Sequence, residues 1–174
     1  MGTPKALLPY DGVPFVQRLA RLFERHCAPV VVVVHAGLLP AVQALGVAAV
    51  VNPDPDRGQL SSLQTGLAAL PPGCSVLFTP VDCPAIEDDT ISVLLQAAGA
   101  PIVRPRYQDR RGHPVLASPA VVAELLALPA GATAREVVHR HAASTVYVDV
   151  PDPGITHDID HPEDYHRLTG GKVA

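Results

Sequence analysis

The sequence predicts an α/β fold with a doubly wound, mainly parallel sheet and flanking helices. Short apolar runs rich in β-branched residues alternate with amphipathic segments of helical period for most of the 174 residues. That alternation is typical of consecutive βαβ units, in which helices connect parallel strands. Runs such as residues 30–34 are apolar without alternation, so we expect these strands to be buried on both faces of the sheet. The length fits one domain over residues 1–174.

The first half of the chain predicts strands and helices in turn. Residues 3–15 are expected to form a proline-containing loop with a turn at Asp11-Gly12. Apolar residues then recur at helical spacing between Val16 and Phe23, which predicts an amphipathic helix ending near His26. Further strands are expected at residues 30–34, 47–51 and 75–78, and further helices at 38–45 and 63–70.

The second half adds one antiparallel hairpin to this pattern. Residues 101–105 are expected as a strand, and 114–116 return beside it after a charged turn. Acidic residues 87–89 open a helix, because the helix dipole favours negative charge in the first turn. Ser118-Pro119 is an N-cap followed by proline at the first helical position. The remaining expected elements are a helix at 133–141, a strand at 145–150 and a last helix that starts at Pro162.

Composition excludes several classes of protein. Hydrophobic residues make up 48% of the chain and the mean hydropathy is +0.22, so a sizeable core is available. The net charge is −4 and no lysine or arginine block occurs, which argues against a nucleic-acid partner. The apolar runs are too short to span a membrane, and no signal peptide is visible. Three cysteines without metal-ligand spacing make a disulfide framework unexpected and favour a reducing, cytoplasmic location.

Asp82 stands out among the polar residues. It follows the apolar strand at 75–78 and precedes a Cys-Pro pair that stops this strand. In open α/β sheets, ligands bind outside the carboxyl ends of the strands. A carboxylate at that point suits a divalent cation shared with a nucleotide phosphate, because Mg²⁺ usually takes only one or two protein carboxylates. The alternative is that Asp82 merely caps a turn.

Five separated segments carry motifs: MGTPKALL at residues 1–8, GQLSSLQTGL at 58–67, VDCP at 81–84, RGHPV at 111–115 and DIDHPED at 158–164. They resemble motifs of the MobA-like nucleotidyltransferases, most closely the branch that includes molybdenum cofactor cytidylyltransferase. In that family the corresponding segments are the second half of an opening LAAGxSxRMGxxKxLL motif, a central GxxxSLxxGL segment, a metal-binding DxP turn, a substrate-side GHPV turn and a DIDTPED ending. Their order and spacing extend along nearly the whole chain. The resemblance implies a Rossmann-like nucleotidyltransferase fold.

The resemblance also implies a reaction and a metal. A nucleophile on the acceptor attacks the α-phosphate of a nucleoside triphosphate, and pyrophosphate leaves. Lys5 would contact a phosphate and, together with Asp82, carry catalysis. Mg²⁺, with Mn²⁺ as the alternative, would be held by Asp82 and Asp160, with Asp158 nearby. The structural alternative for Asp160 is a capping box with Glu163, and His161 with Pro162 also fits an N-cap followed by the first helical position.

Two further groups of residues follow from the resemblance. Ser61, Ser62 and Gly66 would lie at the start of a helix whose N–H groups face the nucleotide. His113 and Arg135 would face the acceptor. The alternatives are helix capping by the serines, a solvated histidine in a turn and a surface arginine.

The leading hypothesis is an enzyme that transfers CMP from CTP to a phosphorylated cofactor such as molybdopterin, with a molybdoenzyme as a further partner. GTP and ATP are the alternative donors. The family's first strand and LAAGxSxR phosphate loop would precede Met1. The strand at 30–34 is therefore expected to lack a neighbour on one side. We favour a misassigned start, and expect the 174-residue chain to be weakly active or inactive compared with an extended one.

The alternative function is that of a non-catalytic nucleotide- or cofactor-binding relative that has lost the phosphate loop. A redox domain of the flavodoxin or Rossmann type is disfavoured, because no GxGxxG follows a predicted strand.

Overall fold

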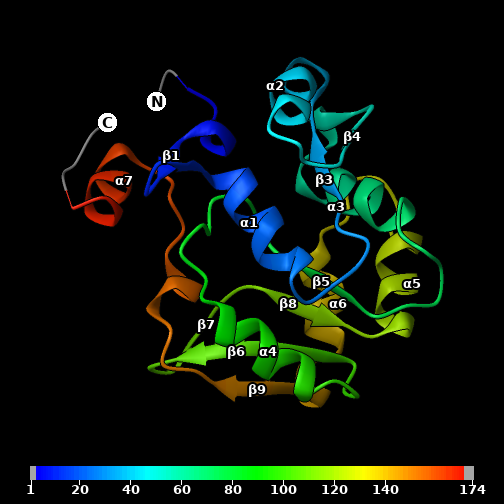
Figure 1. Cartoon of the computed structure of the whole chain (residues 1–174). Coiled ribbons are helices and arrows are strands. Elements are labelled where there is room, and N and C mark those ends of the chain that lie inside the picture. The colour runs from blue at the N-terminus through cyan, green and yellow to red at the C-terminus, as the bar shows by residue number, and fades with distance from the viewer. Residues whose placement is uncertain (1–2, 171–174) are drawn as a thin grey trace.

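Helices cover the strands in the computed structural model of the chain, which describes residues 3–170 (Figure 1). The strands are β1 Pro9–Tyr10, β2 Val13–Pro14, β3 Val32–Val34, β4 Ala49–Val51, β5 Val76–Phe78, β6 Ile102–Tyr107, β7 Arg110–Arg111, β8 Val115–Ala117 and β9 Thr145–Asp149. The helices are α1 Phe15–Glu24, α2 Leu39–Ala44, α3 Gln59–Ala68, α4 Asp88–Gln96, α5 Pro119–Ala127, α6 Ala134–Arg140 and α7 Pro162–Leu168. Short 3-10 turns are η1 Lys5–Leu7, η2 Ala36–Leu38, η3 Pro55–Arg57, η4 Ala142–Ser144 and η5 Pro153–Thr156.

The largest sheet has the strand order β5-β8-β6-β7, with β9 paired to β6. β8 is antiparallel to both β5 and β6, so β5 and β6 run in the same direction. β9 is parallel to β6, and β3 is parallel to β4. α4 thus connects the parallel strands β5 and β6, and α2 connects the parallel strands β3 and β4, whereas β7 and β8 run antiparallel to β6. This arrangement confirms the predicted α/β fold and the predicted hairpin near residues 101–117.

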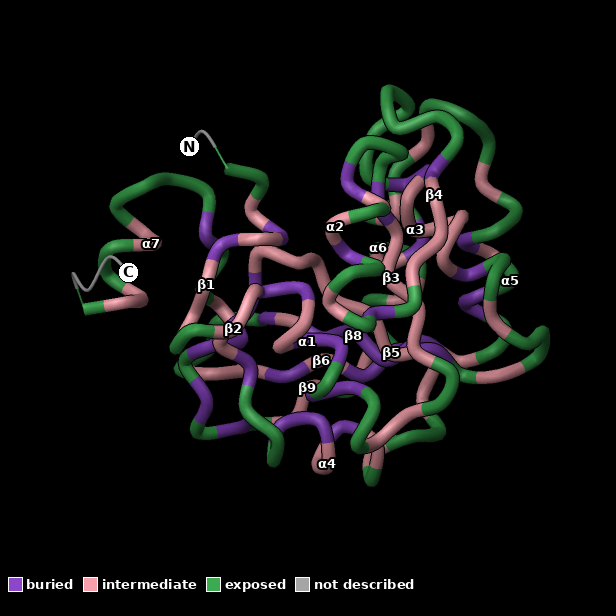
Figure 2. Tube along the Cα trace, turned by 45° about the horizontal axis from the view of Figure 1, so that its top comes forward, coloured by how far each residue is buried: buried purple, intermediate pink, exposed green. Residues whose placement is uncertain are grey.

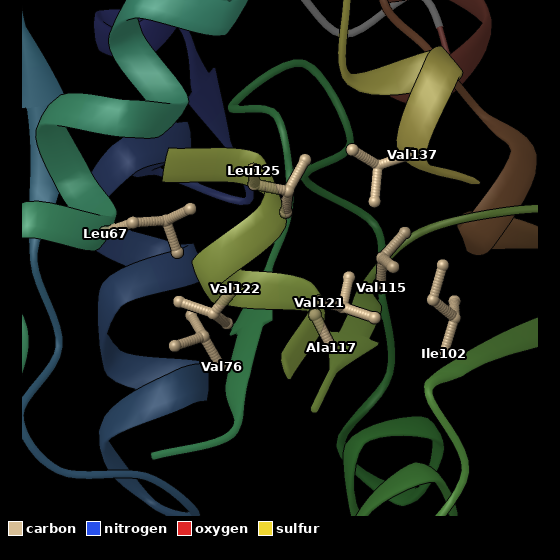
Figure 3. Close-up of a cluster of buried hydrophobic side chains, with 9 residues drawn as sticks. All are labelled: Leu67, Val76, Ile102, Val115, Ala117, Val121, Val122, Leu125 and Val137. Atoms are coloured by element: carbon tan, nitrogen blue, oxygen red, sulfur yellow. The ribbon is translucent and has the colours of Figure 1, made fainter. Parts of the chain in front are cut away.

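Alternating side chains of the sheet pack against different helices. Ile102, Val115 and Ala117 join a core cluster with α3, α5 and α6 (Figure 3). Their neighbours Val103 and Leu116 instead pack with residues of α4. Because successive strand residues point to opposite faces, helices must cover both faces of the sheet. The buried parts of the chain accordingly gather along β6 and β8 (Figure 2).

β3 and β5 each have only one neighbouring strand among residues 3–170. β3 pairs with β4, and β5 pairs with β8. The pairing of β3 agrees with the expectation that residues 30–34 lack a neighbour on one side.

The segment predicted as a loop at residues 3–15 contains more structure than expected. β1 and β2 form a short antiparallel hairpin across a two-residue turn. Asp11 and Gly12 have φ values of 49° and 77°, which suits the tight hairpin turn that Asp-Gly sequences favour. No helix within residues 3–170 has the length and the apolar character that crossing a bilayer requires.

Candidate active site

Three predicted site residues meet although they are far apart in sequence. Lys5 lies in η1, Asp82 follows β5, and Asp160 lies just before α7. The Lys5 Nζ donates a hydrogen bond to Asp160 Oδ1 at 2.7 Å and lies 3.8 Å from Asp82 Oδ2. One ammonium group thus faces two carboxylates that were both expected to hold a metal. Met1 and Gly2, which belong to the same opening motif, lie outside the described residues.

The Asp158-Ile159-Asp160 segment is anchored by its central residue. Ile159 is 2% exposed and packs with Leu8 and Phe15. Its N–H donates to the Asp82 carbonyl oxygen at 2.9 Å, which joins the segment to the strand end. Both flanking aspartates are exposed. A buried isoleucine between two acids therefore presents Asp158 and Asp160 beside Asp82.

The environment of Asp82 favours its neutral form. Burial raises the pKa of the Asp82 carboxyl above its ordinary value, the positive charge of Lys5 opposes that shift, and the negative charges of Asp158 and Asp160 add to it. A bound cation would remove the conflict between these carboxylates, and their oxygens are the ligands that Mg²⁺ and Mn²⁺ prefer. The donor set therefore fits a hard divalent cation held by Asp82 with Asp160 or Asp158.

Cys83 also belongs to this group, although its spacing in the sequence gave no indication of it. The fully buried Cys83 thiol donates to Asp158 Oδ1 at 3.1 Å and lies 3.9 Å from Asp82 Oδ1. Burial and the hydrogen bond to Asp158 raise the pKa of this thiol far above its ordinary value. It is therefore protonated when no metal is bound.

Two glycines let the loops around the site pack backbone against backbone. A Cβ on Gly154 would overlap the Ala85 carbonyl oxygen, and a Cβ on Gly112 would overlap the Ile155 carbonyl oxygen. The turn of the GHPV motif thus rests on η5, and η5 rests on the loop that follows Asp82. Only glycine leaves room for both contacts.

Asp152 holds η5 to α4 and was not singled out from the sequence. It is 1% exposed, and its carboxylate accepts hydrogen bonds from Glu87 N at 2.9 Å, Thr90 Oγ1 at 2.7 Å and Gly154 N at 2.8 Å. A buried carboxylate with three donors is well satisfied. Asp152 therefore fixes the start of the segment that carries Asp158 and Asp160.

His113 lies in the expected turn, but it is not the solvated residue of the structural alternative. Its backbone N–H donates to the Ile155 carbonyl oxygen at 2.9 Å, and the ring Nδ1 is buried without a hydrogen-bond partner. Burial, with a smaller contribution from Arg104, lowers the pKa of His113 to about 4, and the negative charge of Asp158 opposes the shift. His113 is thus neutral near pH 7, with a free ring nitrogen.

We expect acid to destabilise the protein through His113. The unfolded chain binds a proton at this position below about pH 6.5, whereas the folded chain stays neutral until about pH 4, so stability falls as the pH drops through that window. The full loss is about 3 kcal/mol, from 1.36 kcal/mol for each pKa unit. Urea unfolding at pH 7 and pH 4.5 should show this slope in the wild type and in the control His139→Gln, but a clearly smaller one in His113→Gln. Equal slopes in all three proteins would contradict the assignment.

Ser61 and Ser62 lie in the first turn of α3, but they do not cap it. The N-cap is Gly58, without a side-chain capping bond, so the serine-cap alternative is wrong. Asn52, at the end of β4, donates to Ser61 Oγ at 2.8 Å and to Ser62 Oγ at 3.0 Å. These hydroxyls connect the helix start to the loop after β4. Gly66 was expected at the helix start as well, but it lies in the second half of α3, where a Cβ would press on Val33.

The start of α7 differs from the capping box that was the structural alternative for Asp160. The N-cap of α7 is His161, and the Asp164 side chain accepts from His161 N at 2.9 Å. The capping box proposed between Asp160 and Glu163 is therefore wrong, because the box lies one residue later. Asp160 keeps its carboxylate for Lys5.

Arg135 is exposed on α6. That helix is capped by a box between Thr133 and Glu136 and packs beside α5. It lies apart from the elements that bring Lys5 and the acids together, so an acceptor role for Arg135 stays a prediction.

A lysine and several carboxylates gathered beside an α/β sheet fit a nucleotidyltransferase, in which cations offset the charge of the phosphates. The sequence model of the MobA-like NTP transferase domain matches residues 1–146, and the chain belongs to that family. No curated protein matches the chain.

Solved structures agree with the family. Rv0371c from Mycobacterium tuberculosis H37Rv is 27% identical, with a TM-score of 0.84 over 98% of this chain and 90% of that one. Its complex with manganese is 26% identical, with a TM-score of 0.80 over 97% of this chain and 93% of that one. Molybdopterin-guanine dinucleotide biosynthesis protein A from Archaeoglobus fulgidus is 14% identical, with a TM-score of 0.70 over 97% and 90%, and shows the fold alone.

Proposed function

We propose that this nucleotidyltransferase transfers CMP from CTP to a phosphorylated cofactor such as molybdopterin and releases pyrophosphate. An acceptor phosphate oxygen forms the new bond to the α-phosphorus as the bond to pyrophosphate breaks. A molybdoenzyme would receive the product. The convergence of Lys5, Asp82 and Asp160 carries the proposal, because it supplies a cation for the phosphates and carboxylates for a metal.

Each residue has a place in this proposal. Asp82 and Asp160, with Asp158, hold Mg²⁺ or Mn²⁺, and the manganese complex of Rv0371c supports a divalent cation. Lys5 faces the triphosphate. The roles of the other candidates rest on the family resemblance: Ser61, Ser62 and Gly66 bind the nucleotide, and His113 and Arg135 bind the acceptor.

Titration calorimetry tests the proposed nucleotide site. CTP, GTP and ATP, each with Mg²⁺ or Mn²⁺, are titrated into the wild type, into Asp82→Asn and into Asp89→Asn, which alters an exposed acid on α4. We expect metal-dependent binding of CTP to the wild type and the control. The loss in Asp82→Asn is expected to be about 100-fold, which corresponds to about 2.7 kcal/mol. Equal affinity in both variants, or no binding by a folded protein, would contradict the proposal.

Pyrophosphate release tests the transfer itself. With molybdopterin as the acceptor, the pyrophosphate that the 174-residue chain releases, at the low rate expected of it, should come only from the triphosphate that it binds. Binding of a triphosphate without even slow release would favour the non-catalytic alternative.

A further inference from the structure

One sulfur and two carboxylate oxygens lie close together beside the predicted nucleotide site. The ligand atoms of Asp82, Cys83 and Asp158 all lie within 4.8 Å of one another. Cys83 Sγ is 3.1 Å from Asp158 Oδ1 and 3.9 Å from Asp82 Oδ1. Cys83 is fully buried, Asp82 is half-buried and Asp158 is exposed, so solvent reaches this cluster at the acids and not at the thiol.

These distances fit a tetrahedral ion that binds sulfur. A tetrahedral Zn²⁺ with a Zn–S bond of about 2.3 Å and Zn–O bonds of about 2.0–2.2 Å separates sulfur from oxygen by about 3.5 Å. The two observed separations, 3.1 Å and 3.9 Å, lie on either side of that value. Each sulfur–oxygen separation therefore lies within about 0.4 Å of the tetrahedral value. Mg²⁺ takes oxygen ligands only, so it would leave Cys83 unused.

We propose that Asp82, Cys83 and Asp158 form a site for a thiophilic divalent cation such as Zn²⁺. The three side chains supply three ligands, and water fills the fourth position. As the sulfur–zinc bond forms, the Cys83 S–H bond breaks and the proton goes to the buffer, while zinc loses bound water. The hydrogen bond from Cys83 to Asp158 is replaced by two bonds to the same ion.

The site has a consequence for the proposed function, on which this step rests. Asp82 is a ligand both for the thiophilic ion and for the hard cation of the nucleotide. Two dications that share one carboxylate repel each other, so zinc on Asp82 opposes binding of the nucleotide's Mg²⁺ there. Zinc should therefore weaken binding of the Mg²⁺–triphosphate complex in proportion to its occupancy of the site.

Cadmium provides a probe that needs neither nucleotide nor turnover. Cd²⁺ bound to a thiolate absorbs in the ultraviolet, and Zn²⁺ competes for the same ligands. The reference protein is Cys27→Ser/Cys74→Ser, which removes the other two thiols. We expect a saturable band from one equivalent of Cd²⁺, its reversal by Zn²⁺, and complete loss of the band when Cys83→Ser is added. Absence of the band in the reference protein, or its persistence after Cys83→Ser, would overturn the site.

A second variant covers the case in which Cys83→Ser fails to fold, because that residue is buried. Asp158→Asn alters an exposed side chain and should keep the fold, with Cd²⁺ affinity at least tenfold weaker. Unchanged affinity in Asp158→Asn would overturn the site as well. Zinc that binds normally yet leaves triphosphate binding unchanged would support the thiolate site and contradict only the shared role of Asp82.

Discussion

Replacing Gly154 by alanine is expected to lower the free energy of unfolding by about 3 kcal/mol, at the upper end of the usual cost of overpacking a buried position. Gly154 is buried, and a Cβ there would overlap the Ala85 carbonyl oxygen and crowd Asp152 Oδ1. A backbone oxygen cannot rotate away as a side chain can, so η5 must move off the loop that follows Asp82. That movement would also separate Asp158 from Cys83. Urea unfolding measures the first effect, and Cd²⁺ titration measures the second.

Gly37→Ala is the matched control for this substitution. A Cβ at Gly37 would meet only the ring of His35, at 3.4 Å, which is ordinary van der Waals contact. We expect a change within about 0.5 kcal/mol, as for most surface substitutions. If Gly154→Ala were as stable as Gly37→Ala, the close contact between η5 and the 85–87 loop would be disproved.

The strands could be predicted from the sequence because their signal is local. Runs of β-branched residues mark β3 and β4, and helical periodicity marks α1 and α4. The pairing of the strands is not a local property. That β8 inserts between β5 and β6 follows from packing both faces of the sheet, and no short segment of sequence carries that information.

Only part of the site could be predicted, because the sequence shows local motifs but not which distant residues meet. The resemblance singled out Lys5, Asp82 and Asp160, but only the folded chain brings together residues that lie 155 positions apart. Cys83 and Asp152 were missed because their roles depend on burial. Asp152 occurs in an Asp-Pro-Gly stretch that is typical of an exposed turn.

The position of the last helix cap, in contrast, could be inferred from one residue. An acid three positions after a candidate cap occurs twice, as Glu163 after Asp160 and as Asp164 after His161. Pro162 decides between the two registers, because proline favours the first helical position and so places the N-cap at His161. The same register leaves Asp160 free for Lys5.

Lys5→Met is expected to change two affinities in opposite directions. Without nucleotide, the Lys5 ammonium lies against Asp160 and near Asp82, where a dication must displace it. Breaking a partly exposed ion pair of this kind costs an incoming dication about 1 kcal/mol. Because Lys5→Met removes this cost, free Mn²⁺ should bind the variant about fivefold more tightly. The triphosphate loses a charge-assisted contact worth about 1.5–3 kcal/mol, so its Mn²⁺ complex should bind about 10- to 100-fold more weakly.

Opposite signs distinguish this role of Lys5 from a merely structural one. Loss of packing in η1 would weaken both kinds of binding together, and that result would disprove the dual role. Arg21→Met, which removes a positive charge from an exposed position on α1, should leave both affinities unchanged. The Mn²⁺ and triphosphate titrations should be carried out near pH 7.5. Lys5 lowers the pKa of the Asp82 carboxyl, so its removal raises that pKa further. In acid, protons would then compete for Asp82 and hide the gain in Mn²⁺ affinity.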